Sequence, residues 1–253
     1  MTNSPNRPVK TVETAAEILR TLEGADGMAL TEIAERIGNA ESTTHRHLET
    51  LEHNEFVIKE AGQYRLSYRF LDFGTKLRLN DPLFDVGREY ADQLAEETNE
   101  RVWLSTIENG YGVSLYWAST RPPLNHHSRV GSRHLLHNNA NGKAMLAELP
   151  DERVATILQR RGLPAKTEQT ITDEDTLMEE LATVSERGYA VSSGENFEGM
   201  SSVAVPIKVE SAGVLGAMGI GFSPNSQASS ERERFVRLLK DVTDEISIRI
   251  RVE

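Results

Sequence analysis

Hydroxyl and arginine side chains share one side of a predicted helix in the N-terminal third of the chain. If Thr44, Leu48 and Leu51 face a core, the helical repeat of about 100° per residue points Ser42 and Arg46 away from it. Short donors and a guanidinium near the start of an exposed helix can reach phosphates and base edges in the major groove of DNA. Polar helix faces are also common on ordinary protein surfaces, so the spacing alone leaves a solvated face as an equal alternative.

The segments around this helix predict a winged helix-turn-helix. Apolar residues at helical spacing predict a first helix from Thr11 to Leu22 and a second from Leu30 to Ile37, which Gly38 ends. Strand-forming residues at Phe56–Ile58 and Gln63–Leu66 enclose turn residues and predict a hairpin. Short helices joined by a turn that contains glycine form a helix-turn-helix, and the hairpin after them would be the wing.

Two segments of this region resemble the IclR family of transcriptional regulators. The run from Glu41 to Leu51 (ESTTHRHLETL), followed by Phe56-Val57, is similar to the family's recognition helix. The run from Tyr64 to Gly74 (YRLSYRFLDFG) resembles its wing and the entry to its linker. The helix face and the resemblance together give the candidate DNA contacts Ser42, Thr43, Thr44, Arg46, His47, Thr50, Lys59, Gln63, Arg65 and Lys10. The expected partner is double-stranded DNA with a palindromic operator, bound by a homodimer or a dimer of dimers.

The dipeptide Asp81-Pro82 predicts the start of another helix, because aspartate caps a first turn and proline fits its first position. An apolar stripe from Leu83 to Leu94 continues this helix. Residues 80–98 are therefore predicted as a linker helix between a DNA-binding domain of residues 1–79 and an effector-binding domain of residues 99–253. Strand signals on both sides of a helical block in the latter predict an α+β fold, with an antiparallel sheet covered by helices.

Four later segments resemble the effector-binding domain of the same family. They are Leu136–Leu146, Arg187–Asn196, Gly199–Pro206 and Gly213–Gly221. The resemblance implies a GAF-like α/β domain that binds a small-molecule effector on one face of the sheet. Carried over position by position, it gives the candidate effector contacts Leu136, Ala140, Asn141, Ser192, Glu195, Met200, Ser202 and Gly219.

Two of these positions depart from the family's pattern. Many members have a carboxylate at the position of Ser192 and a cysteine at the position of Ser202. A serine keeps a hydrogen-bonding hydroxyl but removes the negative charge, so the effector is expected to differ from those that other members bind. A sugar or an organic acid is the expected class, and no other cofactor is expected.

Other kinds of chemistry have weaker support in the residues. Because the chain has no cysteine, disulfides, thiol catalysis and zinc–thiolate sites are excluded. His126, His127, His134 and His137 suggest a metal site, but on a strand His134 and His137 would point to opposite faces. No nucleophile with a matching base emerges, so no enzymatic activity is expected. The alternatives are a small-molecule-metabolising enzyme and a signalling module whose winged helix contacts protein.

The charge balance argues against binding of DNA through bulk attraction. The chain carries 39 acidic and 28 basic side chains, for a net charge of −11. Residues 1–79 hold 12 acidic and 10 basic side chains, so the phosphate contacts must come from a few local cations. An acidic surface suits a high-salt cytoplasm, where counterion release from DNA contributes little. A cytoplasmic protein is expected, because no signal peptide and no apolar run of about 18 residues is visible.

Overall fold

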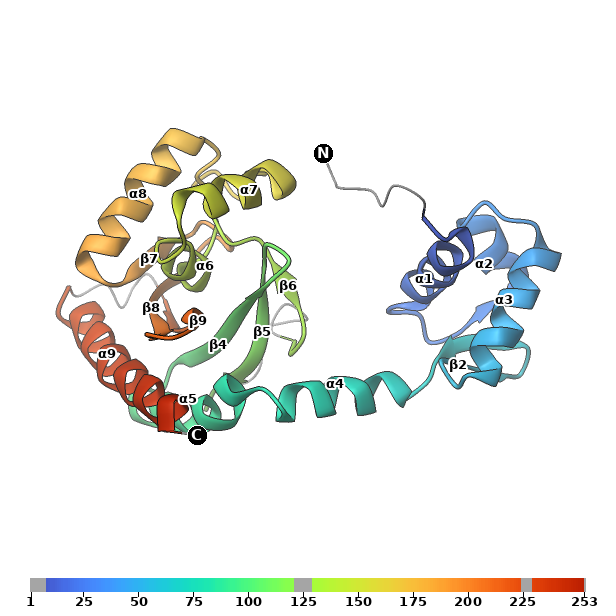
Figure 1. Cartoon of the computed structure of the whole chain (residues 1–253), viewed down its shortest axis with the longest axis horizontal. Coiled ribbons are helices and arrows are strands. Elements are labelled where there is room, and N and C mark those ends of the chain that lie inside the picture. Colours follow the sequence, from blue (N-terminus) through green and yellow to red (C-terminus); the bar gives the residue numbers. More distant parts are fainter. Residues whose placement is uncertain (1–7, 121–128, 224–228, 253) are drawn as a thin grey trace. The chain divides into compact units, whose positions relative to one another are not determined.

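The computed structural model describes residues 8–120, 129–223 and 229–252. It divides the chain into two compact units, which meet in sequence between Leu77 and Arg78 (Figure 1). This division falls two residues before the predicted end of the first domain at residue 79.

The N-terminal unit is built around helices α1 to α3 and a small antiparallel sheet, and most of α4 also belongs to it. Helices α1 (Lys10–Leu22), α2 (Leu30–Arg36) and α3 (Glu41–His53) precede the hairpin of β2 (Val57–Glu60) and β3 (Gln63–Leu66), and β1 (Met28–Ala29) pairs with β3. The core of this unit consists of Ile18, Leu22, Met28, Ile33, Leu48, Leu51, Val57 and Tyr64. The apolar residues that the helical periods place inward thus meet in one cluster, and the predicted winged helix-turn-helix is confirmed.

Two turns of the N-terminal unit use left-handed backbone conformations. Gly38 has a φ of 65° and follows α2, as the sequence predicts. In the wing, Ala61 and Gly62 have φ values of 49° and 82°. Positive φ at both central residues is the conformation that matches the twist of a two-residue hairpin, although alanine adopts it at a cost.

Helix α4 (Arg69–Leu79) follows the wing and has no buried residue. Helix α5 (Pro82–Thr98) starts as predicted, since Asp81 Oδ1 accepts a hydrogen bond of 2.9 Å from the Leu83 backbone N–H. However, its stripe from Leu83 to Leu94 packs into the core of the C-terminal unit. The assignment of residues 80–98 as a linker is therefore corrected, and the exposed α4 is the helix that connects the units.

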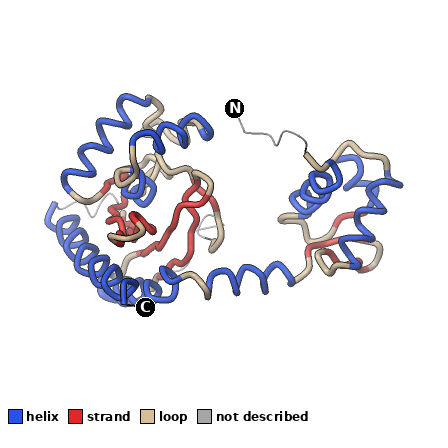
Figure 2. Tube along the Cα trace, in the orientation of Figure 1, coloured by secondary structure: helices blue, strands red, loops and turns tan. Residues whose placement is uncertain are grey.

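The C-terminal unit is built on a six-stranded antiparallel sheet with helices on both faces (Figures 1 and 2). The strands follow the order β6 (Arg133–His134), β5 (Tyr111–Ala118), β4 (Arg101–Glu108), β9 (Gly213–Phe222), β8 (Ser201–Val209) and β7 (Ala190–Ser193). Helices α5 and α9 (Ser229–Val252) cover one face, and α6 (Ala140–Leu146), α7 (Asp151–Arg161) and α8 (Glu174–Arg187) cover the other. The predicted α+β class is confirmed.

Alternation along β8 explains the two hydrophobic cores of this unit. Val203, Val205 and Ile207 belong to the core beneath α5 and α9, whereas Ala204 belongs to the core beneath α6, α7 and α8. Successive side chains of a strand point to opposite faces, so one strand serves both layers. Burial on both faces also explains why β8 and β9 are nearly continuous apolar runs.

Candidate functional site

The exposed face of α3 carries most of the predicted DNA contacts. Ser42, Thr43, Arg46 and Thr50 are all exposed, and they stand on the side of α3 away from the core. The Thr50 hydroxyl donates a hydrogen bond of 2.9 Å to the Arg46 carbonyl, so its oxygen keeps acceptor capacity outward. This face offers hydroxyls and one guanidinium within the first turns of α3, the donors suited to DNA.

Thr44 does not belong to this face, and its prediction as a DNA contact is wrong. The residue is fully buried, and its hydroxyl donates to the Ala40 carbonyl at 3.2 Å. Helical geometry already places Thr44 with Leu48 and Leu51 on the inner side. His47 lies at an intermediate depth between the two faces.

The wing and the start of α1 carry the other predicted contacts. Lys10 is the first residue of α1 and is exposed, as are Lys59 and Gln63 on the wing. Arg65 is half-buried and forms an ion pair of 3.3 Å with Glu60 on the facing strand. A surface pair of this kind is worth about 0–1 kcal/mol, so Arg65 can exchange Glu60 for a phosphate at little cost.

In the C-terminal unit, Asn141 fixes the start of α6 onto the sheet. Its side-chain amide donates to the Trp103 carbonyl at 3.2 Å and to the Ala217 carbonyl at 3.1 Å, and it lies 3.3 Å from Ser105 Oγ. These partners on β4 and β9 use its donors, so Oδ1 alone remains for a ligand. The sequence does not indicate these contacts, because they join segments far apart along the chain.

Two glycines of β9 let neighbouring side chains, Asn141 among them, pack directly on the backbone of the sheet. A Cβ added at Gly219 would collide with Asn141 Oδ1, and one added at Gly221 would meet the ring of Trp103 and Met200 Cε. The Trp103 ring therefore lies beside the predicted effector residues Asn141, Met200 and Gly219. The sequence does not predict this position, because a tryptophan on a strand looks the same when it only packs in a core.

Ser192 and Ser202 face each other across the pairing of β7 and β8. They lie on the side of the sheet that carries Ala190 and Ala204, beneath α6 and α8. Ser192 is buried and Ser202 is half-buried. The two hydroxyls thus share the face on which Asn141 meets the sheet.

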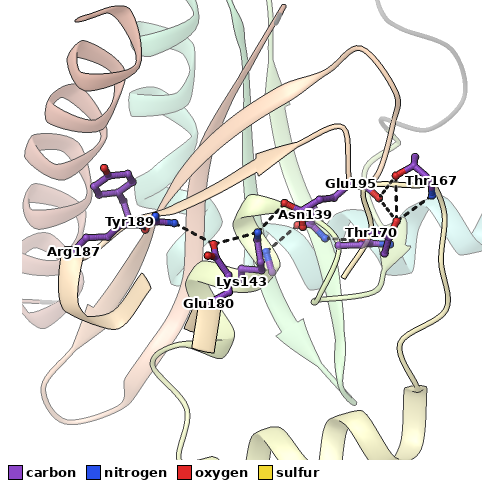
Figure 3. Close-up of polar contacts among 10 residues, drawn as sticks. Asn139, Lys143, Thr167, Thr170, Glu180, Arg187, Tyr189 and Glu195 are labelled. Atoms are coloured by element: carbon purple, nitrogen blue, oxygen red, sulfur yellow. Dashed lines mark hydrogen bonds and ion pairs between the residues drawn. The ribbon is translucent and has the colours of Figure 1, made fainter. Parts of the chain in front are cut away.

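Three other predicted effector residues have different surroundings. Leu136 and Ala140 are 2% and 1% exposed and pack within the core of that face. Glu195 instead forms a buried ion pair of 2.8 Å with Lys143, which Figure 3 shows. The predicted set therefore divides into the Asn141 group and a separate charged cluster around Lys143.

The histidines give no metal site in the described part of the structure. His134 Nε2 is buried above Gly112, and this burial lowers the pKa of His134 to about 4. His137 is also buried, with Nε2 3.3 Å from the Pro164 carbonyl, and its burial lowers its pKa. Among described residues no three potential ligands converge, and His126 and His127 lie outside them. None of the described helices is long and apolar enough to span a membrane.

Both units match known families. Residues 11–61 match the family described as "IclR helix-turn-helix domain", and residues 79–248 match "Bacterial transcriptional regulator IclR C-terminal". The chain is similar to the probable transcriptional regulator SauR of Cupriavidus necator, with 30% identity over 235 residues, 92% of this chain and 93% of that protein. It is 28% identical over 222 residues to the probable HTH-type transcriptional regulator ArcR of Halobacterium salinarum, covering 86% and 84% of the two chains.

Solved structures of IclR regulators share the fold of this chain. A crystal structure of an IclR transcriptional regulator from Alicyclobacillus acidocaldarius matches with a TM-score of 0.79 at 28% identity, covering 96% of this chain and 99% of that one. The C-terminal family match alone spans more than half of the sequence. This chain therefore belongs to the IclR family of bacterial transcriptional regulators.

Proposed function

We propose that this regulator binds a palindromic DNA operator as a homodimer or a dimer of dimers, and that a small-molecule effector changes the affinity. The exposed start of α3 carries the proposal, because Ser42, Thr43 and Arg46 stand there clear of the core. In a two-fold dimer, paired recognition helices would read two half-sites about one turn of DNA apart.

Substitution of Arg46 tests the DNA-binding face. We expect Arg46→Ala to weaken operator binding by about 10- to 100-fold, because a guanidinium that contacts a base contributes about 1–3 kcal/mol. Fluorescence anisotropy with a promoter fragment measures the affinity, and circular dichroism checks the fold.

Arg20→Ala is the matched control, because Arg20 is an exposed arginine of α1 outside the predicted contacts. It removes the same charge from the same unit and should change the affinity less than threefold. Equal losses in both variants would mean that bulk charge, not the α3 face, binds DNA.

The proposed coupling is thermodynamic linkage between two sites. An effector that prefers one arrangement of the C-terminal units shifts the population of that arrangement and thus the spacing of the winged helices. The proposed effector site is the sheet face shared by Asn141, Ser192 and Ser202. Helix α4 is the proposed connection, since it joins the two units and has no buried residue of its own.

A thermal-shift screen of sugars, sugar acids and aromatic acids can find the effector. A compound that binds only the native state raises the unfolding temperature. We expect such a compound to change operator affinity when it is added at saturation. A confirmed ligand that leaves operator affinity unchanged would refute the coupling while leaving DNA binding intact.

We further propose that the C-terminal unit acts without turnover. Membership of a family of transcriptional regulators supports binding as its role. Recovery of the bound effector chemically unchanged after prolonged incubation is the expected result, and its conversion to a product would overturn the proposal.

A further inference from the structure

A carboxylate lies on the same exposed side of α3 as the predicted DNA contacts. Glu49 follows Ser42 by seven residues, which is close to two helical turns, so the two residues lie on one line along the helix. Around the helix axis, Glu49 lies about 60° from Arg46. The Glu49 side chain is 61% exposed and extends away from the core of the N-terminal unit. Glu49 is not among the contacts predicted from the sequence.

The contacts of Glu49 within the chain do not explain a carboxylate at this place. Glu49 Oε2 lies 3.5 Å from His45 Nδ1, one turn earlier on α3, and the His45 side chain is 41% exposed. An exposed pair of this kind contributes little to stability, so Glu49 can exchange His45 for another donor. The ion pair joins Glu49 to His45 and not to Arg46, so the carboxylate does not hold the Arg46 guanidinium in place.

A carboxylate on a helix face that meets DNA weakens binding unless a hydrogen-bond donor of the DNA faces it. The phosphates are negatively charged, and guanine and thymine present only acceptor atoms in the major groove. Adenine presents a donor at N6, but the acceptor N7 beside it would repel a carboxylate. Cytosine presents the N4 amino group alone, and glutamate accepts a hydrogen bond from it. Cytosine is therefore the base that suits Glu49.

The position of Glu49 along α3 relates this base to the one that Arg46 reads. An α-helix rises about 1.5 Å per residue, so Glu49 lies about 4.5 Å beyond Arg46 along the axis. Successive base pairs of DNA are about 3.4 Å apart. The donor side chain and the acceptor side chain are thus spaced to reach base pairs that are neighbours or nearly so.

We propose that Glu49 determines part of the operator sequence by accepting a hydrogen bond from the N4 amino group of a cytosine. This cytosine lies within about two base pairs of the base that Arg46 contacts. The inference rests on the proposed DNA binding and adds a specificity-determining residue to it. A carboxylate that only repels DNA would instead weaken binding to all sequences equally.

Selection of bound sequences from a pool of randomised DNA duplexes, with the full chain, tests this assignment. We expect the parent chain to enrich a two-fold symmetric site with a preferred cytosine in each half. Glu49→Gln should shift that one position from cytosine toward adenine, because a glutamine amide pairs with N6 and N7 of adenine. Glu52→Gln is the matched control and should leave every position unchanged. Glu52 is an exposed glutamate of the same helix, but it lies about 120° from Arg46 around the axis.

Two duplexes then measure the discrimination by fluorescence anisotropy. One carries the selected site, and in the other the C·G pair is replaced by T·A, which puts the O4 acceptor of thymine where cytosine has its donor. The parent chain should bind the first at least tenfold more tightly, whereas Glu49→Ala should discriminate less than threefold. The ratio of the two affinities is unaffected by the uniform gain that loss of a negative charge brings.

Three outcomes would overturn the proposal. A preference for cytosine that survives both Glu49 variants would show that another group reads this base. A gain in affinity on both duplexes, with an unchanged ratio, would show that Glu49 only repels DNA. The absence of any enriched site with the parent chain would overturn the proposed DNA binding together with this inference, so the two failures can be told apart.

Discussion

Single buried polar side chains determine how the C-terminal unit is assembled. Asn141 satisfies all its donors on β4 and β9, and Gly219 leaves the space that its Oδ1 occupies. His134 is the opposite case, because its Nε2 is buried without a hydrogen-bond partner in the described structure. Asn141 holds α6 on the sheet through satisfied hydrogen bonds, whereas buried His134 makes the stability of the C-terminal unit depend on pH.

His134 should make the C-terminal unit less stable as the pH falls. Its pKa is about 4 in the folded chain and about 6.5 when unfolded, so between these values the unfolded state binds more protons. Stability is therefore fully present above the unfolded value and is lost as the pH falls toward 4. Between pH 7.5 and 5 the contribution is about 2 kcal/mol.

The measurement is urea unfolding followed by tryptophan fluorescence at several pH values. Both tryptophans, Trp103 and Trp117, lie in the C-terminal unit, so the signal reports on that unit. His134→Gln removes the titrating group and should flatten the slope. An unchanged slope in this variant would show that other groups cause the pH dependence.

At the scale of elements, α4 and the wing depend on contacts that local patterns only partly encode. The first turn of α4 begins where the Ser67 hydroxyl accepts from the Arg69 N–H at 3.1 Å. Phe56 packs against Phe70 and Phe73 with ring centres 5.7 and 6.1 Å apart. These aromatic contacts favour a helix in a segment whose central Gly74 disfavours one.

The wing turn offers an element-scale prediction. Ala61 has a positive φ, and Gly62 follows it with another. Ala61→Asn would create Asn-Gly, the dipeptide preferred in this type of turn, and should stabilise the N-terminal unit by about 0.5–1 kcal/mol. Ala61→Val should destabilise it, because a β-branched side chain tolerates positive φ poorly.

Thermal unfolding monitored by circular dichroism compares the two variants with the parent chain. The expected order of unfolding temperatures for the N-terminal transition is Asn above Ala above Val. A reversed order would contradict the left-handed turn.

For the whole molecule, the distribution of charge determines how DNA binding responds to salt. Most of the net charge of −11 lies beyond residue 79, and residues 1–79 carry a net charge of only −2. Lys10, Arg46, Lys59 and Arg65 are the cations at the predicted contacts, so few counterions can be released. Adaptation of the protein to concentrated salt stays a prediction, which the salt dependence of operator binding tests.

Operator binding should therefore weaken less steeply with salt than the binding of a strongly basic protein. With about four phosphate contacts per chain, the logarithm of the affinity should fall against the logarithm of the salt concentration with a slope of about −4 per chain. Anisotropy titrations from 0.2 to 2 M KCl measure this slope, with a basic DNA-binding protein as reference. A slope as steep as that of the reference would contradict the interpretation.

The sequence by itself determined the winged helix-turn-helix, the class of the second unit and most helix starts. Helical period and caps such as Asp81-Pro82 act over a few residues, so local order is enough to predict them. The exposed face of α3 follows from the helical period for the same reason. The period also points Thr44 inward, so its prediction as a DNA contact was wrong on the sequence evidence itself. The family resemblance located the other segments of the sheet.

Only the tertiary structure decided which surfaces meet. It buries α5 in the C-terminal core instead of leaving it as a linker, because strands β4 and β5 and helix α9 supply its apolar partner face. It likewise joins Lys143 to Glu195 and places Asn141 against Trp103. Such contacts depend on the order and register of strands that are dozens of residues apart. The spacing of side chains along the chain therefore does not predict them.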